Sequence, residues 1–282
     1  MSVTAPVADR LNGSFEWLDH RGPFRILTEA QARSYDENGF FVLPDALTAS
    51  EVDALTAAID PFEREAEEAL RGMEGGRFFI ARADEITFTT HLVPRSPVLR
   101  SFTAGALLAD LCADLIGPDV RLYWDQAVYK KPGTESPFPW HQDNGYAFVE
   151  PQQYLTCWVA LTDATPDNGC PQVARGLHRT GTLAHTYVEP LGFECLHDPD
   201  EVAVAEVGAG GVVVFSSLTP HLTGPNTTAF TRKAYILQYA PAGAEVLRGD
   251  PAHEPVSREP ATDPTFQYPV VRGGVAVSEA DR

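Results

Sequence analysis

The first part of the chain reads as two capped helices with a short apolar strand between them. Thr28 and Gln31 have the spacing of a capping box, which predicts a helix that begins after Thr28. Gly39 ends this helix, because glycine readily takes the left-handed conformation that follows a helix. The apolar residues 40–43 predict a strand, and a second capping box that begins at Thr48 predicts another helix with one apolar face.

From about residue 76 the pattern changes to short runs rich in β-forming residues, separated by Gly, Pro and Asn. One helix is predicted near 107–115. Strands are predicted at Val120–Tyr129, His141–Val149, Thr156–Leu161, Val212–Ser217 and Ala234–Tyr239. Many short strands with little helix between them are typical of a β-sandwich or jelly roll, not of a parallel α/β sheet. We therefore expect a mainly β fold with flanking helices.

The length of 282 residues and the 44% hydrophobic content are sufficient for one such domain. We expect an N-terminal arm at 1–25 and a single jelly-roll domain at 26–250 that includes the N-terminal helices. Residues 251–282 are rich in Pro and polar residues without clear periodicity, which predicts an extended or partly disordered tail.

The formal charge of -18 with only three Lys disfavours nucleic acid and anionic membranes as partners, since both are bound chiefly through Lys and Arg. The four Cys form no CxxC pair, and the chain has neither a secretory signal nor an apolar run of the roughly 20 residues that span a bilayer. These features predict a cytoplasmic protein with a small-molecule partner. They leave its oligomeric state open between monomer and homodimer.

The most informative chemistry lies in His141-Gln142-Asp143, followed by a distant His221. In an extended strand, residues two apart point the same way, so His141 and Asp143 are expected on one face. A third ligand from His221 completes two imidazoles and one carboxylate, the ligand set of Fe(II) oxygenases. The same set also binds zinc, and a lone His on a strand is more often structural. Arg232, 11 residues after His221, has the planar fork that suits a carboxylate, although a surface salt bridge is the ordinary role of an Arg.

The order and spacing of His141, Asp143, His221 and Arg232 resemble the phytanoyl-CoA dioxygenase (PhyH) family of Fe(II)/2-oxoglutarate-dependent oxygenases. Further landmarks are the capped helix before Asn38-Gly39-Phe40, the Trp158 strand, Asp167-Asn168-Gly169 and Gly176-Leu177-His178. The similarity covers roughly residues 27–243, and Leu177 departs from the Ser usual in that turn. The resemblance implies a double-stranded β-helix (jelly roll, cupin-like) with N-terminal helical decoration.

The resemblance implies that His141, Asp143 and His221 bind Fe(II), while Arg232 and Thr223 bind the far carboxylate of 2-oxoglutarate. It also implies that O2 and 2-oxoglutarate are consumed with release of succinate and CO2. The expected outcome is hydroxylation of an unactivated C–H bond in an amino-acid-like molecule or a secondary metabolite, with acyl-CoA less favoured. Asp143 disfavours halogenation, because related halogenases have a small residue there.

Five further residues are candidates for contacts with the co-substrate or substrate. Gln126 and Trp158 resemble a polar and an aromatic contact near the co-substrate, and each is equally well explained as an ordinary strand residue. Asn144, Tyr146 and Trp140 flank the ligand motif and are candidate substrate contacts. Two other functions stay open: a cupin-like metal-dependent hydrolase or isomerase, and a non-catalytic jelly-roll binding module.

Overall fold

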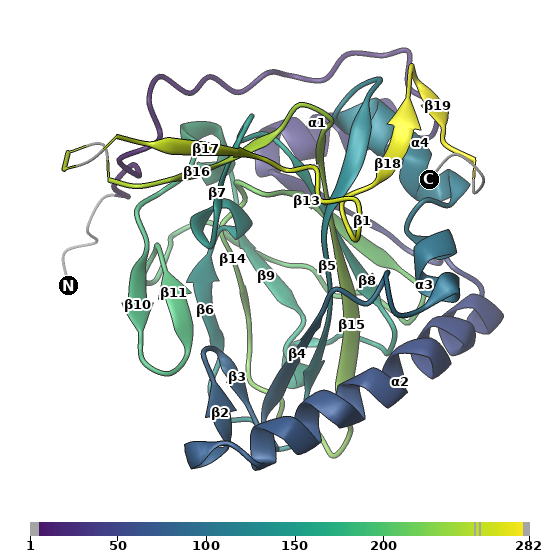
Figure 1. Cartoon of the computed structure of the whole chain (residues 1–282), viewed down its shortest axis with the longest axis vertical. Helices are drawn as coiled ribbons and strands as arrows, with labels where there is room; N and C mark the ends of the chain where they lie inside the picture. The colour runs from purple at the N-terminus through teal and green to yellow at the C-terminus, as the bar shows by residue number, and fades with distance from the viewer. Residues whose placement is uncertain (1–5, 251, 254, 279–282) are drawn as a thin grey trace.

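The computed structural model describes residues 6–250, 252–253 and 255–278. It contains a large antiparallel sheet and a smaller four-stranded sheet whose side chains share one apolar cluster, and helices cover the outer face of the large sheet (Figure 1). This arrangement confirms the mainly β jelly roll of the double-stranded β-helix type with flanking helices.

The large sheet has ten strands, and the remaining strands form three smaller sheets. Its main path runs β1 (Phe40–Leu43), β13 (Val212–Ser216), β8 (Leu155–Ala160), β15 (Arg232–Pro241), β5 (Val120–Lys130), β4 (Ile86–Thr90), β3 (Ala81–Arg82) and β2 (Arg77–Phe78), with β18 (Pro269–Arg272) paired to β5 and β19 (Val275–Ala276) to β18. The four-stranded sheet runs β12 (Val202–Val204), β9 (Pro171–Ala174), β14 (His221–Thr223) and β6 (Phe138–His141). The others are β17 (Ser257–Pro260), β16 (Glu245–Arg248) and β7 (Phe148–Glu150), and the hairpin of β10 (Thr186–Val188) and β11 (Gly192–Glu194).

The predicted helix starts and the short strand are confirmed. The helices are α1 (Glu29–Asn38), α2 (Ala49–Arg71), α3 (Pro97–Phe102) and α4 (Ala106–Leu115). Both capping boxes form, with Thr28 before α1 and Thr48 before α2, and Gly39 takes the left-handed conformation after α1. A Cβ on Gly39 would lie 2.5 Å from Oγ1 of Thr219, so this turn packs directly against the segment that leads to His221. The chain therefore enters β1 at a position fixed relative to β14.

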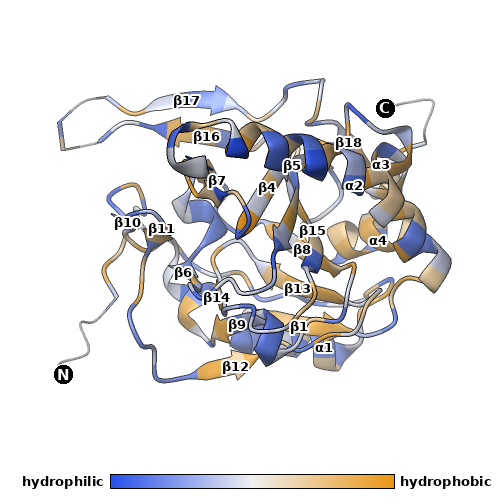
Figure 2. Cartoon of the chain, turned by 90° about the horizontal axis from the view of Figure 1, so that it is seen from below, coloured by the Kyte–Doolittle hydropathy of each residue, from blue (hydrophilic) through white to orange (hydrophobic). Residues whose placement is uncertain are grey.

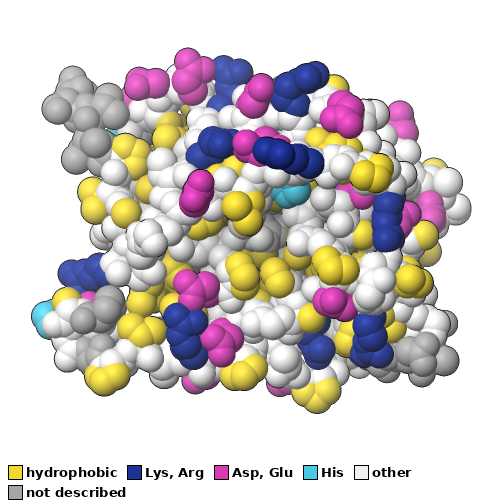
Figure 3. Space-filling view, turned by 90° about the horizontal axis from the view of Figure 1, so that it is seen from above, with side chains coloured by type: hydrophobic (Ala, Val, Ile, Leu, Met, Phe, Trp, Pro, Cys, Tyr) yellow, Lys and Arg dark blue, Asp and Glu magenta, His cyan; other side chains and the backbone are white. Residues whose placement is uncertain are grey.

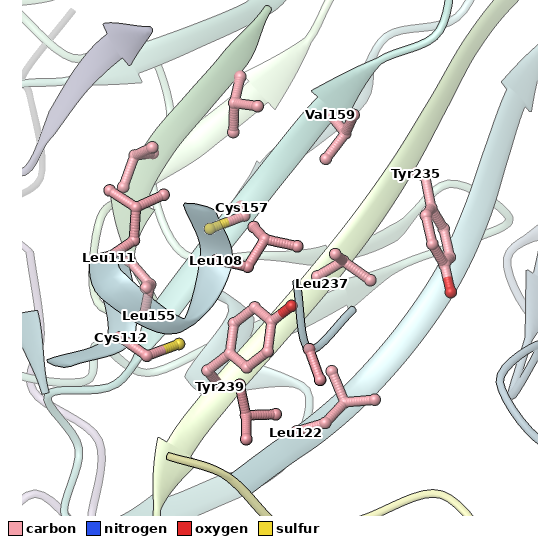
Figure 4. Packing of buried hydrophobic residues seen from close by; sticks show 14 of the residues in the cluster. Leu108, Leu111, Cys112, Leu122, Leu155, Cys157, Val159, Tyr235, Leu237 and Tyr239 are labelled. Atoms are coloured by element: carbon pink, nitrogen blue, oxygen red, sulfur yellow. The ribbon is translucent and has the colours of Figure 1, made fainter. Parts of the chain in front are cut away.

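The main hydrophobic core lies between the outer face of the large sheet and the helices. Leu108, Leu111 and Cys112 of α4 pack against side chains such as Leu155 and Tyr239 (Figure 4). Figure 2 shows apolar residues concentrated in inner strands such as β13, while the peripheral strand β17 is polar. This core holds the sheet rigid from outside and leaves its inner face for the functional site.

Two segments differ from the sequence prediction. The predicted strand His141–Val149 is broken, because β6 ends at His141, a single 3-10 turn (η2, Asp143–Gly145) follows, and β7 begins only at Phe148. The segment from 251, expected to be an extended tail, instead supplies β17, β18 and β19 in its described part. Val270 and Val271 of β18 are fully buried in the main core. The described part of the N-terminal arm also packs on the domain, since Trp17 is buried in the same core.

Candidate iron and co-substrate site

Two histidines face each other at the ends of neighbouring strands. His141 is the last residue of β6 and His221 is the first residue of β14, and the two are direct partners in the antiparallel register. Their ring centroids lie 4.1 Å apart. A register shift after this pair brings Phe138 opposite Thr223, so Phe138 and His141 both line the same cavity although they are three residues apart. The irregular pairing concentrates functional side chains at one place.

Asp143 reaches the two histidines from the 3-10 turn η2, not from the strand itself. One ligand atom from each of His141, Asp143 and His221 lies within 4.8 Å of the others, close enough for one metal ion. Gln142 holds this turn, because its buried amide donates to the carbonyl oxygens of Gly181 and Leu218. The side chains of His141 and Asp143 therefore point the same way because of this turn, and the predicted strand alternation is not the cause.

Both imidazoles are oriented by the backbone. Nδ1 of His141 lies 2.8 Å from the carbonyl oxygen of Pro139, and Nδ1 of His221 lies 3.0 Å from that of Thr219. A carbonyl only accepts, so Nδ1 carries the proton in each ring and Nε2 keeps its lone pair for a metal. Burial lowers the pKa of His141 well below its usual range, and the neighbouring His221 lowers it further. His141 is therefore neutral at neutral pH, as a metal ligand must be.

The carboxylate of Asp143 is oriented by a residue that the sequence did not single out. Oγ1 of Thr156, on β8, donates to Oδ2 of Asp143 at 2.5 Å. Oδ1 remains 4.0 Å from Nε2 of His221, on the side of the two imidazoles. Thr156 lies on a strand that was predicted correctly, but no local signal distinguishes a carboxylate-orienting Thr from an ordinary strand residue.

Arg232 opens β15 and is 1% exposed, yet it has no anionic partner. Its Nη1 makes a single long contact of 3.5 Å with the carbonyl oxygen of Val128. Within the described part of the chain, its Nε and Nη2 have no hydrogen-bond partner, and the residue forms no ion pair. Burial lowers the pKa of Arg232 to about 10. Since an unpaired buried cation is costly, this arrangement fits a carboxylate ligand such as that of 2-oxoglutarate.

Thr223 and Trp158 lie where such a ligand would bind. Both line the same cavity as the triad and Arg232, and the guanidinium carbon of Arg232 is 5.1 Å from the centroid of the Trp158 ring. Oγ1 of Thr223 accepts from Lys130, a fully buried residue of β5 that was not predicted to belong to the site. Lys130 is the direct partner of Arg232 in the antiparallel pairing of β5 and β15. The two residues are 102 positions apart in the chain, so no local sequence pattern predicts that they are neighbours.

Gln126 also lines this cavity, and its Oε1 accepts from the indole N–H of Trp124 at 3.3 Å. The rest of the wall is apolar. It consists of Ile86, Phe88, Val128, Phe138, Phe215 and Ile236. The cavity thus combines a metal-ligand set, one unpaired cation and a wall that excludes water.

The three candidate substrate contacts have different surroundings. Tyr146 lies edge-on to His141, with ring centroids 5.4 Å apart, and its hydroxyl accepts from the backbone N–H of Phe193. Asn144 is fully buried, and its amide donates to Oγ1 of Thr182 and accepts from the backbone N–H of Val149. Trp140 packs in a separate cluster with Ala174, Leu183 and Leu196. Of the three, Tyr146 alone contacts a triad residue through its ring.

Comparison with known proteins agrees with this geometry. The family described as phytanoyl-CoA dioxygenase (PhyH) matches residues 35–234. Ectoine dioxygenase of Sphingopyxis alaskensis is 27% identical over 278 residues, covering 84% of this chain and 88% of that protein. Phytanoyl-CoA dioxygenase 1 of Oryza sativa subsp. japonica is 25% identical, covering 76% of this chain and 89% of that protein. The crystal structure of EctD from S. alaskensis with 2-oxoglutarate and 5-hydroxyectoine is 25% identical with a TM-score of 0.62, covering 86% of this chain and 84% of that one.

The fold and the site together define a non-haem iron oxygenase that depends on 2-oxoglutarate. Within that class, the chain belongs to the phytanoyl-CoA dioxygenase family. The resemblance noted from four residues and a few landmarks is confirmed.

Proposed function

We propose that this enzyme hydroxylates an unactivated C–H bond of a small molecule, with 2-oxoglutarate as co-substrate. The observation that carries the proposal is the unpaired, fully buried Arg232 in the same cavity as His141, Asp143 and His221. Two imidazoles and one carboxylate on one side of a metal leave positions for exchangeable ligands. A buried cation nearby provides the second point that fixes a chelating dicarboxylate.

Each residue has a separate task in this proposal. His141, Asp143 and His221 hold the iron, and Thr156 keeps one oxygen of Asp143 directed at it. Bound iron, 2-oxoglutarate and O2 together supply the oxidising chemistry. Arg232 and Thr223 orient the co-substrate through its far carboxylate, and the apolar wall keeps water from the reacting centre. Asp143 fills the ligand position that a halide would need, which favours hydroxylation over halogenation.

The substrate is proposed to be a small amino-acid-like molecule or secondary metabolite, and a CoA thioester is less favoured. Apart from the triad and Arg232, the described residues that line the cavity offer no charged side chain to a polyanionic substrate such as a CoA thioester. All three Lys are engaged within the fold, since Lys130 is buried, Lys131 pairs with Glu63 and Lys233 pairs with Asp60. They are therefore not available to bind the phosphates of CoA. The relatives of this chain include proteins named ectoine dioxygenase and phytanoyl-CoA dioxygenase, which are named for substrates of both kinds.

We also propose that the enzyme acts in the cytoplasm. All four Cys are free. None of the described helices is long and apolar enough to cross a membrane.

The proposed function is tested by anaerobic titration of the purified protein with Fe(II) and then 2-oxoglutarate. We expect the weak visible charge-transfer band of the iron chelate, and succinate release when O2 and a substrate from a metabolite panel are added. His141→Ala is expected to abolish both signals. Wild-type protein that gives neither the band nor succinate would contradict the proposal and leave the metal-dependent hydrolase or the binding module as explanations.

A hydrolase or isomerase with the same ligand set would need only the metal and a bound water. Nothing in such a mechanism uses an unpaired Arg in the same cavity as the metal ligands. Arg232 is therefore the residue that separates the two functions.

A further inference from the structure

A buried Lys lies beside the Arg that lines the cavity. Lys130 on β5 and Arg232 on β15 are direct partners in the antiparallel register, and both are essentially inaccessible to solvent. Throughout the described residues, neither forms an ion pair with a carboxylate. Burial lowers the pKa of Lys130 well below its usual range, with further lowering by Arg232 and then Arg82. No acidic side chain in the described part of the chain compensates this pair, so an anionic ligand bound at Arg232 would favour the protonated form of Lys130.

The hydrogen bonds of Lys130 all go to neutral oxygens on one short segment. Its Nζ donates to the carbonyl oxygen of Thr223 at 3.1 Å, to Oγ1 of Thr223 at 3.2 Å and to the carbonyl oxygen of Gly224 at 2.5 Å. Protonated Lys130, the form that a bound anion favours, has three N–H donors, so these three bonds use all of them. Lys130 itself therefore has no donor left for a ligand.

The bond to Oγ1 determines what the hydroxyl of Thr223 can do. A hydroxyl has one hydrogen, and its oxygen here already accepts from an ammonium group, so the hydrogen must point elsewhere. Among the described residues, no acceptor receives it, and Thr223 lines the cavity beside Arg232. The hydroxyl is thus held as a donor directed at the space where a carboxylate would bind.

We propose that Lys130 is a positioning residue for the co-substrate, which acts by holding the Thr223 hydroxyl as a hydrogen-bond donor to the carboxylate bound by Arg232. The proposal rests on the proposed function, because the carboxylate in question is that of 2-oxoglutarate. It assigns Lys130 no direct contact with the co-substrate. Its effect must therefore pass through Thr223.

A double-mutant cycle tests this dependence. Wild type, Lys130→Met, Thr223→Val and the double variant are titrated anaerobically with Fe(II) and with 2-oxoglutarate, and the visible band gives a Kd for each. A hydrogen bond to a charged group is worth roughly 10- to 100-fold in affinity, so T223V should raise the Kd for 2-oxoglutarate by about that factor. K130M should also raise it, and the double variant should bind about as weakly as T223V alone. The Kd for Fe(II) should stay within about twofold of wild type in all four.

Lys233→Met is the matched control. Lys233 adjoins Arg232 on the same strand but pairs with Asp60 on the other face of the sheet, at 2.8 Å and 2.9 Å. We expect its Kd for 2-oxoglutarate to equal that of wild type. An unchanged Kd in K130M, or effects of K130M and T223V that multiply in the double variant, would overturn the positioning role; multiplication would show that Lys130 acts through its charge alone.

The failure of this inference is distinguishable from failure of the proposed function. If wild type gives no band with 2-oxoglutarate, the proposed function itself fails. If wild type gives the band and K130M binds equally well, only the role of Lys130 is lost. Met has nearly the length of Lys but removes three hydrogen bonds together with the charge, so the melting temperature of K130M is measured first to show that the variant is folded. Should K130M not fold, Lys130→Leu replaces it in the cycle; failure of both to fold would assign Lys130 to the fold and overturn the proposal.

Discussion

At the scale of single residues, the site is a set of groups whose hydrogen bonds leave one atom free for a ligand. Backbone carbonyls take the Nδ1 protons of His141 and His221, and Thr156 takes one oxygen of Asp143. Arg232 has donors without acceptors. Each side chain is thus held in position by the fold while the atom needed for binding remains available.

Arg232→Met tests the cost of that arrangement. Without a carboxylate partner, the buried guanidinium destabilises the ligand-free protein, whereas Met fills similar space without charge. We expect R232M to lose at least 100-fold in affinity for 2-oxoglutarate and to unfold at an equal or higher temperature than wild type when both are free of ligand. Differential scanning calorimetry with and without 2-oxoglutarate measures both effects. A lower melting temperature for ligand-free R232M would show that Arg232 has a structural role.

Thr156→Val tests the orientation of Asp143. Valine has the shape of threonine without the hydroxyl, so the carboxylate loses its donor while the strand keeps its packing. Partners that orient metal ligands are worth about 10- to 100-fold in metal affinity, and we expect a loss in that range for Fe(II). Thr186→Val, an exposed position on β10, is the control and should bind as wild type does. Equal Fe(II) affinities in both variants would remove Thr156 from the site.

At the scale of elements, local signals in the sequence were sufficient for some parts and absent for others. The capping boxes at Thr28 and Thr48 act within one turn, so they are readable in a single sequence. The turn that carries Asp143 was missed although Asp143-Asn144-Gly145 is a typical turn sequence, because the apolar residues on both sides also suit one continuous strand. The pairing of β18 with β5 joins segments nearly 150 residues apart, and no short-range pattern predicts such a contact.

Residues from 269 onward are predicted to be part of the folded unit. Val270 on β18 is 0% exposed in the main core, whereas Val275 on β19 is 68% exposed. Val270→Asp would bury a carboxylate without a partner, and we expect it to lower the free energy of unfolding by about 3 kcal/mol or more. Val275→Asp should change it by less than about 0.5 kcal/mol. Urea unfolding followed by circular dichroism compares the two, and equal values would mean that β18 does not pack on the core in solution.

At the scale of the whole molecule, the face drawn in Figure 3 has no continuous patch of basic side chains. Figure 3 shows basic side chains next to acidic ones there. Near β16 and β17, Arg258 pairs with Glu150 and Glu245, and Arg248 pairs with Glu259. With a net charge of -18, this pattern supports a small-molecule substrate over a polyanion.

The stability of the whole fold should fall in mild acid, partly because of His178. Burial lowers the pKa of His178 to about 4, and the nearby Arg179 adds to the effect. In the unfolded chain, this His has a pKa near 6.5. The stability that comes from holding His178 neutral in the fold is therefore complete above pH 6.5 and is lost as the pH falls towards 4. Between pH 7 and pH 4, we expect the free energy of unfolding to fall by about 3 kcal/mol less in His178→Gln than in wild type.

Urea unfolding at several pH values measures this difference. His197→Gln is the control, because the side chain of His197 is 92% exposed and should leave the pH dependence unchanged. A pH dependence of H178Q identical to that of wild type would mean that His178 is not buried in its neutral form.

The unpaired Arg232 has an evolutionary consequence. A residue that lowers the stability of the empty protein is retained only while selection for co-substrate binding continues. In a descendant that no longer needs 2-oxoglutarate, replacement of Arg232 by an apolar residue would be favoured by the gain in folding stability. The identity of this one position would then reveal whether a related sequence is still under selection as an enzyme, even where its iron ligands persist.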